Sequence, residues 1–327
     1  MDGFSISPYS LPLEDKYFSC GNNLFNGLFG VFTDSLPDAW GELLFNRYIE
    51  KNNIKISSIL DRLAYVGSSG MGSLEYRPEF NKNFSHNDID LDSIQKECEM
   101  LLDSQNIDNI DELYHLGSSS GGARPKILID YNGKHLLVKF SSKYDAKDIA
   151  NKEFEYMNFA KECGIDIPYI QLIKTKNNVY YAIERFDRKN NEKVHMISAA
   201  ALLECDFRSP CLDYIDLLRL TRALTNKKED VIEMFRRMVF NVFFDNQDDH
   251  AKNFSFLYDE ENKNYRLSPA YDLTPGKTYY GEHTTSVNSK GKDINENDML
   301  IVAKKAFIDV KIAKEIINQI RMVRQNN

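Results

Sequence analysis

Apolar residues between positions 127 and 184 occur in short runs that predict a small antiparallel sheet. The runs at 127–130 and 135–140 flank Asn132-Gly133, a dipeptide typical of two-residue hairpin turns. A second pair of short strands flanks Asn177-Asn178, and the later strand reads VYYAIERF. Between the two pairs, the spacing predicts a helix over about 148–163 that is closed by Gly164.

The rest of the chain has mostly helical spacing. Residues 35–38 (Ser-Leu-Pro-Asp) predict the start of a helix that carries Trp40, Leu43, Leu44 and Tyr48 on one face. After residue 188 the pattern predicts helices over 212–224 and 231–244, and a C-terminal helix with an isoleucine-rich stripe between 312 and 323. The segment 86–115 is strongly acidic, with Lys96 as its single Lys or Arg, and we expect a solvated helical connection there.

The composition describes an ordinary globular chain of 327 residues, with 42% apolar and 28% charged residues. A net charge of −8 argues against a broad nucleic-acid-binding surface, although it does not bear on a local basic patch. The five cysteines are scattered and form no CxxC pair, so we expect a reducing cytosol and neither a disulfide framework nor a structural zinc site.

Targeting signals are not visible in the sequence. The first residues lack the basic and then apolar pattern of a signal peptide, and no apolar run approaches the ~20 residues that span a bilayer. We therefore expect a cytoplasmic protein with no direct nucleic-acid or membrane contact. Secretion into a host without a cleavable signal is the alternative.

The stretch NVFFDNQDDHAKNFSFLYD, at 241–259, places acidic, amide and basic residues between two apolar runs. Asp248 and Asn253 are five apart, which is the D-x-x-x-x-N spacing of a kinase catalytic loop. In phosphoryl transfer, a carboxylate accepts or orients the proton of the attacking hydroxyl, and an amide oxygen holds the Mg²⁺ that neutralises phosphate charge. An exposed acidic turn is the alternative reading of these residues.

Asp272 strengthens this interpretation. The chain after Asn253 reads as a hairpin, with strands at 254–258 and 265–267, and then continues as LSPAYDLTPG. The returning strand therefore brings Asp272 beside the start of the hairpin, where a kinase needs its second metal-binding aspartate. A cap before Thr274-Pro275 is the alternative role.

A glycine-rich segment, GSSSGGARPK at 117–126, can present backbone N–H groups to phosphate oxygens. A rival is GSSGMG at 67–72, but only the later segment is followed by a strand, a hairpin and Val138-Lys139. A strand lysine at that place can hold the α- and β-phosphates. Glu153 on the following helix is our first choice for its ion-pair partner, and Glu155 is the second.

The segment AIERFDR follows the sheet and precedes the helical part. Backbone groups of Glu184 and Phe186 are placed to bind adenine there, and Asp187 to reach a ribose hydroxyl. The order of these parts is that of a protein kinase. We therefore expect an α+β, two-lobed protein-kinase-like fold with three consecutive domains: an N-terminal helical and β part over 1–115, a nucleotide-binding sheet over 116–188, and a helical lobe with the catalytic loop over 189–327.

The chain resembles the HipA-type serine/threonine kinases, which are toxins of bacterial toxin–antitoxin modules. The matching stretches are NGLFGVFTDSLPDAWGELL, SSSGGARPK, VKF, AIERFDR, DDHAKNFSFL and LSPAYDLTP. The resemblance implies that Asp248 is the catalytic residue and that Asn253 and Asp272 are the Mg²⁺ ligands. Together with the positions above, the predicted ATP site comprises Gly121, Gly122, Ala123, Arg124, Pro125, Lys126, Lys139, Glu184, Arg185, Phe186, Asp187, His250, Lys252 and Tyr271.

The resemblance also implies control by autophosphorylation, because members of the family phosphorylate a serine of their own glycine-rich loop. The offset from Lys126 indicates Ser119, with Ser118 and Ser120 as neighbouring choices. Full-length members begin with a small β-rich subdomain. This chain resembles a short, HipT-like branch in which that subdomain is a separate small protein.

The implied activity is transfer of phosphate from ATP, with Mg²⁺, to a protein substrate of the aminoacyl-tRNA synthetase class, and the implied outcome is inhibition of growth. A small β-rich antitoxin-like protein and a helix-turn-helix DNA-binding protein are the expected partners. A small-molecule phosphotransferase is the alternative, because antibiotic kinases also use an Asp and an Asn five apart. A nucleotide-binding protein without catalysis is the third reading.

Overall fold

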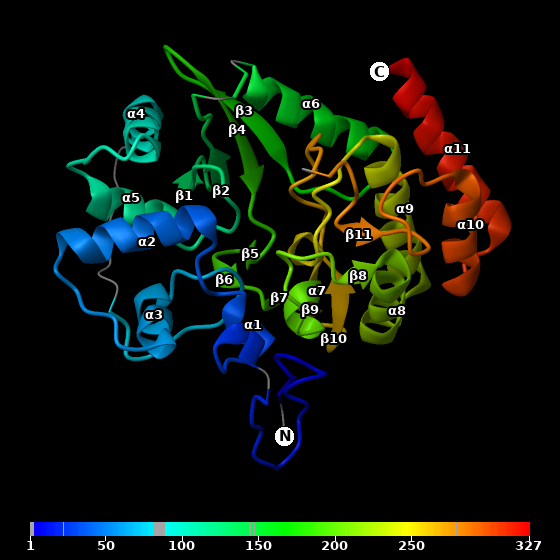
Figure 1. Cartoon of the computed structure of the whole chain (residues 1–327), viewed down its shortest axis with the longest axis horizontal. Coiled ribbons are helices and arrows are strands. Elements are labelled where there is room, and N and C mark those ends of the chain that lie inside the picture. The colour runs from blue at the N-terminus through cyan, green and yellow to red at the C-terminus, as the bar shows by residue number, and fades with distance from the viewer. Residues whose placement is uncertain (1–2, 22, 81–88, 144, 147, 279) are drawn as a thin grey trace. The chain divides into compact units, whose positions relative to one another are not determined.

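The computed structural model describes residues 3–21, 23–80, 89–143, 145–146, 148–278 and 280–327 (Figure 1). Helices and strands are mixed along the chain, as the expected α+β class requires. The chain divides into two compact units, and both are discontinuous in sequence. The sheet unit comprises Asp34–Phe154 and Tyr169–Val194, and the helical unit comprises Met1–Thr33, Glu155–Pro168 and His195–Asn327. The three predicted domains are consecutive stretches, and their limits stay a prediction.

The sheet unit is built on four antiparallel strands in the order β1-β2-β4-β3. These strands are β1 (Lys126–Tyr131), β2 (Lys134–Lys139), β3 (Ile170–Lys174) and β4 (Val179–Glu184). Asn132 and Gly133 join β1 to β2 with φ angles of 51° and 75°, the positive values that a two-residue hairpin turn needs. Ile127, Val138 and Ala182 occupy paired positions across the first three strands, and all three are fully buried.

Helices complete the core of the sheet unit. They are α2 (Ala39–Lys51), α3 (Ile59–Val66), α4 (Leu91–Leu102), α5 (Ile110–Gly117) and the start of α6 (Ile149–Glu162). Trp40 and Leu44 of α2 belong to one buried cluster with residues of α4, α5 and the sheet. This packing corrects the expectation for the acidic segment, because α4 and α5 bury Cys98, Leu101 and Tyr114 in that core. Residues 86–88 of the segment lie outside the described residues.

Besides the end of α6 and two 3-10 turns, the described residues of the helical unit form four longer helices, two short ones and two small sheets. The longer helices are α8 (Tyr214–Thr225), α9 (Lys228–Phe243), α10 (Glu296–Lys305) and α11 (Val310–Asn326), and the short ones are α1 (Gly30–Thr33) and α7 (Ala199–Leu202). A three-stranded sheet has the order β10 (Asn264–Leu267), β9 (Ser255–Asp259) and β7 (Met196–Ser198), and β8 (Leu212–Asp213) pairs with β11 (Thr285–Ser286).

The helix α8 begins where the sequence gives it a capping box. The Asp213 carboxylate accepts from the backbone N–H of Ile215, and the Asp216 carboxylate accepts from the N–H of Asp213. Asn226 ends the helix in the left-handed conformation, with φ of 52°. Leu217 of α8 is fully buried, like much of the facing side of α9. The segment 244–254 follows α9, and it is called the catalytic segment below because it contains the predicted catalytic residue.

Short strands at the start of this stretch were not predicted. The sequence predicts mostly helix after Arg188, apart from the hairpin at 254–267. The strands β5 (Arg188–Lys189), β6 (Glu192–Lys193) and β7 nevertheless follow in close succession. The first two strands form a tight hairpin through Asn190 and Asn191, both at positive φ. Strands of two or three residues are too short to show a period, which is why the pattern missed them.

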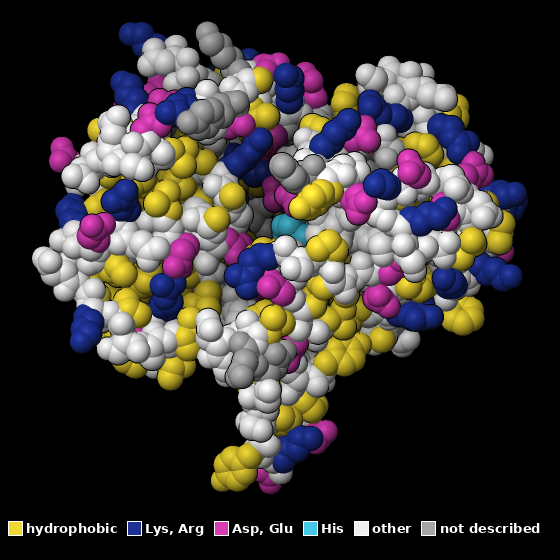
Figure 2. All heavy atoms as spheres, viewed as in Figure 1, with side chains coloured by type: hydrophobic (Ala, Val, Ile, Leu, Met, Phe, Trp, Pro, Cys, Tyr) yellow, Lys and Arg dark blue, Asp and Glu magenta, His cyan; other side chains and the backbone are white. Residues whose placement is uncertain are grey.

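The surface carries both signs of charge. On the face shown in Figure 2, basic and acidic side chains are interspersed, without one large patch of a single sign. Within the part of the chain that the structure describes, no helix has the length and apolar character to cross a lipid bilayer.

Candidate active site

The D-x-x-x-x-N segment leaves the end of α9 and enters β9 through a short 3-10 turn, Ala251–Asn253. The Asp248 side chain is 66% exposed, whereas the neighbouring Asp249 is 1% exposed. The side-chain amide nitrogen of Asn253 donates to the backbone carbonyl of Asp248 over 2.9 Å. This hydrogen bond fixes the two predicted catalytic and metal-binding positions relative to each other.

A buried hydrogen-bond network holds this segment through Asp249. One Asp249 carboxylate oxygen accepts from the Tyr214 hydroxyl (2.7 Å) and lies 2.9 Å from the Nδ1 of His283. The other oxygen accepts from the backbone N–H of Thr285 at 3.1 Å. Burial, with the adjacent carboxylate, raises the pKa of Tyr214, so that its hydroxyl stays protonated and donates. Asp249 is therefore a structural acceptor, and Asp248 is the carboxylate that remains accessible.

The network continues into the helices. The amide nitrogen of Asn241, on α9, donates to the Tyr214 hydroxyl over 2.8 Å. Asn246 in turn donates to the side-chain oxygen of Asn241 over 3.0 Å. Because buried polar groups are costly when they lose a partner, this chain of bonds sets the path of the backbone before Asp248.

His250 and Lys252 lie between the two predicted functional residues and contact a separate loop. The Phe207 ring lies 5.2 Å from the His250 ring, and the Lys252 amino group lies 5.1 Å from the centre of the Phe207 ring. The Nε2 of His250 is 4.0 Å from an Asp248 carboxylate oxygen. These contacts place both residues at the catalytic segment, where they are predicted to contribute to the ATP site.

The Asp272 segment is tied to the same loop on both sides. Before it, the Tyr271 hydroxyl donates to the carbonyl of Lys252 over 2.7 Å. After it, Gly276 forms a parallel bridge with Asn246, and the carbonyl of Gly276 accepts from the N–H of Gln247 over 2.9 Å. The flanks of Asp272 and of Asp248 are thus joined by direct hydrogen bonds.

The oxygen donors in this segment suit Mg²⁺. Because the Asn253 amide nitrogen is held by the Asp248 carbonyl, the amide oxygen is the atom left to accept a cation. Asp272 adds a carboxylate from a backbone with φ of 53°, a left-handed conformation that Asp tolerates better than most residues. Among the described residues, no group of three or more His, Cys, Asp and Glu side chains forms a metal site. Amide and carboxylate oxygens are ligands that Mg²⁺ accepts, so the types of the two residues fit the predicted ion.

In the sheet unit, Lys139 at the end of β2 forms an ion pair with Glu153 of α6, with 3.1 Å between the amino nitrogen and a carboxylate oxygen. Arg124 of the glycine-rich segment lies 3.0 Å from the other oxygen of Glu153 and 3.1 Å from Asp145. Glu153 is 4% exposed, so this pair is shielded from solvent. The structure thus joins Lys139 to Glu153, the first choice over Glu155.

The glycine-rich segment is held by an acidic residue, Asp38, that the sequence analysis did not connect with it. The Asp38 carboxylate, just before α2, accepts from the N–H of Gly122 over 3.0 Å, and the backbone N–H of Trp40 donates to the Gly122 carbonyl over 3.1 Å. Gly122 has φ of 91°, which glycine adopts without strain. The Lys126 amino group donates to the carbonyl of Gly121. One backbone donor that was expected to meet phosphate is therefore occupied by a carboxylate.

The remaining residues of this segment differ in exposure. Ala123 is exposed, and Pro125 is buried with its carbonyl bonded to the N–H of Phe140 over 2.9 Å. The three predicted phosphorylation sites are all buried: Ser118 is 6%, Ser119 8% and Ser120 1% exposed. Phosphorylation at any of these serines therefore requires the segment to leave this conformation.

The predicted adenine- and ribose-binding segment is held mainly by its own neighbours. The N–H groups of Glu184 and Arg185 donate to the carbonyls of Tyr169 (2.8 Å) and His135 (2.9 Å). The Glu184 side chain pairs with Lys134 at 2.9 Å. Phe186 is partly buried. The backbone N–H groups at 184 and 185 are thus already used within the sheet unit.

Asp187 is fully buried, and its carboxylate is saturated. Arg185 donates to both of its oxygens (3.0 and 2.8 Å), and Arg188 and the N–H of Gly72 donate at 2.8 and 2.7 Å. Burial raises the pKa of Asp187, but the two guanidinium groups outweigh burial and lower it overall. These contacts favour a structural role, so we leave Asp187 out of the nucleotide site proposed below. They also give the rival segment at 67–72 a structural role.

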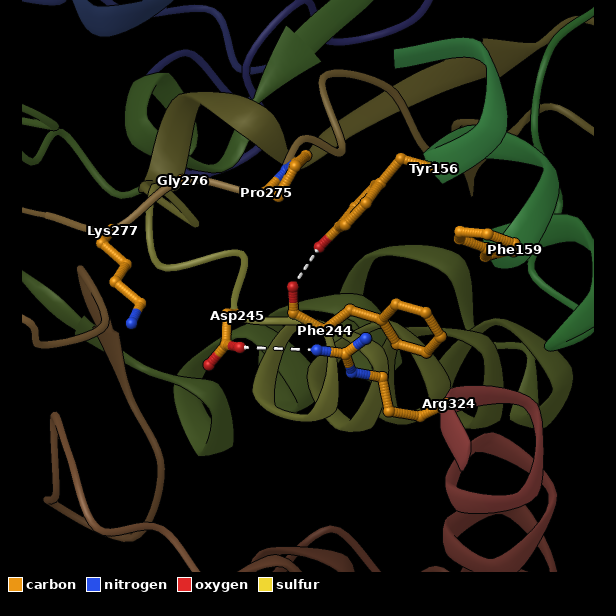
Figure 3. A pocket seen from close by; sticks show the side chains of 8 residues that line it. All are labelled: Tyr156, Phe159, Phe244, Asp245, Pro275, Gly276, Lys277 and Arg324. Carbon is orange, nitrogen blue, oxygen red and sulfur yellow. Dashed lines mark hydrogen bonds and ion pairs between the residues drawn. The ribbon is translucent and has the colours of Figure 1, made fainter. Parts of the chain in front are cut away.

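A cavity of about 310 Å³ lies beside the catalytic segment in the helical unit (Figure 3). It is lined by Tyr156, Phe159, Phe244, Asp245, Pro275, Gly276, Lys277 and Arg324. The Tyr156 hydroxyl donates to the carbonyl of Phe244 over 2.7 Å, and Arg324 lies 3.9 Å from Asp245. None of the predicted site residues lines this cavity, so the cavity is neither support for the predicted ATP site nor evidence against it.

Sequence reasoning missed Asp38, Tyr214 and His283. Asp38 was read only as part of a helix start, which it is, and its second role depends on contact with Gly122, 84 positions later. Tyr214 and His283 reach Asp249 from 35 and 34 positions away. No local pattern marks such long-range partners. The local hint that the sequence offered was His283 itself, a histidine in an otherwise polar stretch.

Comparison with known proteins places the chain in a family. Residues 118–326 match the family model described as HipA-like C-terminal domain, and residues 1–77 match the model described as HipA N-terminal domain. The sequence analysis assigned no HipA N-terminal domain to this chain, because it expected a branch that lacks the N-terminal β-rich subdomain. The second match shows that residues 1–77 correspond to at least part of the HipA N-terminal domain.

Among curated proteins, the chain is 28% identical over 214 residues to Y4dM of Sinorhizobium fredii, which is named as a candidate kinase, covering 58% of this chain and 52% of that protein. It is 24% identical over 188 residues to a protein of Haemophilus influenzae that is likewise named as a candidate kinase, covering 50% and 54%. The chain therefore spans about half the length of the curated relatives it matches.

The fold is also that of a solved structure. A chain in the complex of HipA, HipB and operator DNA from the Shewanella oneidensis toxin–antitoxin system superposes with a TM-score of 0.75 at 17% identity, covering 99% of this chain and 81% of that one. This likeness shows that the chain has the α+β fold of that HipA chain, and the α+β class that we expected is confirmed. Since the C-terminal family model alone covers more than half of its length, the chain belongs to the HipA family.

Proposed function

We propose that this chain is an ATP-dependent serine/threonine protein kinase that acts as a growth-inhibiting toxin. The observation that carries the proposal is the pair formed by Asp248 and Asn253. An accessible carboxylate and an amide whose nitrogen is already bonded are the two groups that phosphoryl transfer requires from such a loop. Family membership supports the same activity.

The roles follow from the contacts of each residue. Asp248 accepts the proton of the attacking hydroxyl, because its exposed carboxylate lies beside Asn253, whereas the carboxylate of Asp249 is buried. Asn253 and Asp272 hold Mg²⁺, which when bound neutralises negative charge on the phosphates of ATP. His250, Lys252 and Tyr271 complete this part of the ATP site, with Tyr271 fixing the Lys252 carbonyl.

The sheet unit supplies the phosphate-binding groups of the proposal. Lys139 contacts the α- and β-phosphates and is oriented by Glu153. The segment Gly121 to Lys126 contributes backbone N–H groups, and the N–H of Gly122 exchanges its bond to Asp38 for one to phosphate. The backbone of Glu184, Arg185 and Phe186 binds adenine through groups other than the two N–H groups used in the sheet.

We further propose that the kinase phosphorylates its own glycine-rich segment at Ser119, with Ser118 and Ser120 as the neighbouring choices. A phosphoserine adds about −1.5 to −2 charge at neutral pH. Placed in the segment that binds ATP phosphates, this charge lowers affinity for the nucleotide. Because the serines are buried, the modification occurs when the segment is open.

The proposed target is an aminoacyl-tRNA synthetase, and family membership is the sole support for that class. A helix-turn-helix DNA-binding protein is the proposed antitoxin partner, since the solved relative is a complex of HipA with HipB and operator DNA. A small β-rich partner stays a prediction. We propose a cytoplasmic location for all of these interactions.

The test is transfer of label from [γ-³²P]ATP in the presence of cell lysate and Mg²⁺. We expect labelled protein bands from the wild type, together with label in the peptide that contains residues 118–120. Asp248→Asn is expected to lose at least about 100-fold of the transfer rate, because the hydroxyl then lacks its proton acceptor. Expression of the wild type without partners is expected to arrest growth, and expression of the variant is not.

Asp245→Asn is the matched control, because it makes the same chemical change at an exposed position of the same segment. It is expected to keep activity. Equal loss in both variants, or full activity in Asp248→Asn, would contradict the assigned role. A small labelled product with no labelled protein would instead support a small-molecule phosphotransferase.

A further inference from the structure

Two cysteines that are separated in sequence meet in the loop between α7 and β8. The sulfur atoms of Cys205 and Cys211 lie 2.8 Å apart, and both cysteines are free thiols. Cys211 is exposed and Cys205 is partly exposed, so small molecules can reach the pair. The sequence analysis expected scattered cysteines without a pairing, and a spacing of six in the sequence gave no reason to join these two.

The loop between the two cysteines is already folded as a compact turn. The Asp206 carboxylate accepts from Arg208 at 2.8 Å, and the backbone N–H of Ser209 donates to the carbonyl of Asp206 over 3.1 Å. A disulfide has its sulfur atoms about 2.05 Å apart, so the bond can form with a small movement of the two side chains.

The same loop carries Phe207, the residue that contacts the catalytic segment. Its ring lies beside His250, and the Lys252 amino group lies over its face. A covalent bond between residues 205 and 211 closes a ring of the chain around Phe207. Such a bond would restrict the movement of this phenylalanine.

We propose that Cys205 and Cys211 form a redox-active pair that reacts with low-molecular-weight disulfides, and that the resulting bond fixes Phe207 on His250 and Lys252 and slows the kinase. The second half rests on the proposed function, whereas the first half does not. Slowing follows because the cation–π contact, once fixed, holds the Lys252 amino group on the ring and away from phosphate.

The small disulfide is the oxidant in this reaction. The Cys211 thiolate attacks one sulfur of the small disulfide, which releases one small thiolate and leaves a mixed disulfide. Cys205 loses its proton and attacks the Cys211 sulfur, which releases the second small thiolate. Two protein thiols are oxidised, one small disulfide is reduced to two thiols, and the two protons from the protein pass to the departing thiolates.

The surroundings favour Cys211 as the attacking group. The hydrogen bond from Cys205 lowers the pKa of Cys211, because the neighbouring thiol keeps its proton and stabilises the thiolate. Cys98 and Cys163 are buried, and burial raises the pKa of each thiol, that of Cys163 to about 12. These two cysteines are therefore poor competitors.

The first measurement is independent of kinase activity. Full-length protein is equilibrated with oxidised glutathione, its remaining thiols are alkylated in denaturant, and it is digested with trypsin. Five thiols are expected to fall to three. Because Arg208 lies between the cysteines, trypsin separates them into peptides 194–208 and 209–219, which remain joined only by the disulfide. Five free thiols, or a bond that involves Cys20, would overturn the proposal.

The second measurement compares label transfer before and after oxidation. We expect oxidised wild type to lose activity and to regain it with dithiothreitol, and we expect Cys20→Ser, the matched control, to behave in the same way. Cys211→Ser and Cys205→Ser are expected to form no internal disulfide and to keep their activity in the oxidant. A disulfide without a change in activity overturns the proposal, whereas reduced protein without activity contradicts the kinase assignment instead.

Discussion

Asp248 and Asp249 are neighbours in sequence, and the fold gives them opposite surroundings. Asp248 is mostly exposed, and Asp249 is enclosed by Tyr214, His283 and Thr285. The Asp248 carboxylate is accessible to a substrate, whereas the Asp249 carboxylate forms the hydrogen bonds that hold the loop. The same substitution at the two positions is therefore expected to have different effects.

We expect Asp249→Asn to lower the free energy of unfolding, and Asp248→Asn to leave it nearly unchanged. An amide at 249 turns an NH₂ group toward donors that need an acceptor, and each buried group left unpaired costs about 1–3 kcal/mol. Urea denaturation followed by circular dichroism measures the difference. Equal stability of the two variants would show that the buried network around Asp249 contributes little.

Individual site residues could be predicted from the sequence where they lie close together in it. Asp248 and Asn253 share a short loop, and Lys139 and Glu153 occupy a strand and the helix that follows it. Their residue types and their order therefore indicated a kinase-like site. Asp38 and His283 act through partners far along the chain, and only folding reveals them. The saturated carboxylate of Asp187 was invisible for the same reason.

At the scale of elements, one acidic side chain of α4, Asp92, makes several hydrogen bonds to the β3–β4 hairpin. The Asp92 carboxylate accepts from the Asn178 amide (2.9 Å) and the Tyr180 hydroxyl (2.7 Å), and further from Thr175 and Asn177. These hydrogen bonds lower the pKa of Asp92 from its ordinary value of 3.8 to about 2. A charge-stabilised contact of this kind predicts a defined dependence of stability on pH.

The folded-state pKa of Asp92 lies below its unfolded value, so the carboxylate stabilises the fold above about pH 4, and this contribution is lost as the pH falls toward 2. We expect Asp92→Asn to unfold more easily than the wild type at neutral pH, with the difference shrinking as the pH drops below about 4. Chemical denaturation at several pH values tests this. Asp108→Asn, at an exposed position after α4, is the control and is expected to show no such convergence.

Elements were predictable where the pattern was long or the turn was distinctive. The Asn132-Gly133 hairpin, α6, α9 and α11 follow directly from spacing and turn chemistry. The strands β5 to β8 are too short to carry a period, and the acidic surface of α4 and α5 hid the apolar side that packs in the core. Side-chain charge on one face of a helix says little about the opposite face.

On the scale of the whole molecule, the chain enters each unit more than once. Helix α6 begins in the sheet unit and ends in the helical unit, and the strands β3 and β4 then return to the sheet. Consecutive domains are the simplest reading of a sequence, because composition changes only gradually along it. The division of this chain is set by long-range packing, which no segment of sequence displays by itself.

The closure of the glycine-rich segment by α2 gives the protein an optical reporter of its own conformation. Trp40 is the only tryptophan in the chain, and its indole N–H donates to the carbonyl of Lys126 over 3.0 Å in a fully buried setting. When the segment opens, the indole is expected to meet water and its emission to shift to longer wavelength. Titration with Mg²⁺ and ATP, or autophosphorylation over time, can thus be followed by intrinsic fluorescence without an added dye. Constant emission while label enters residues 118–120 would show that the segment is modified without disturbing α2.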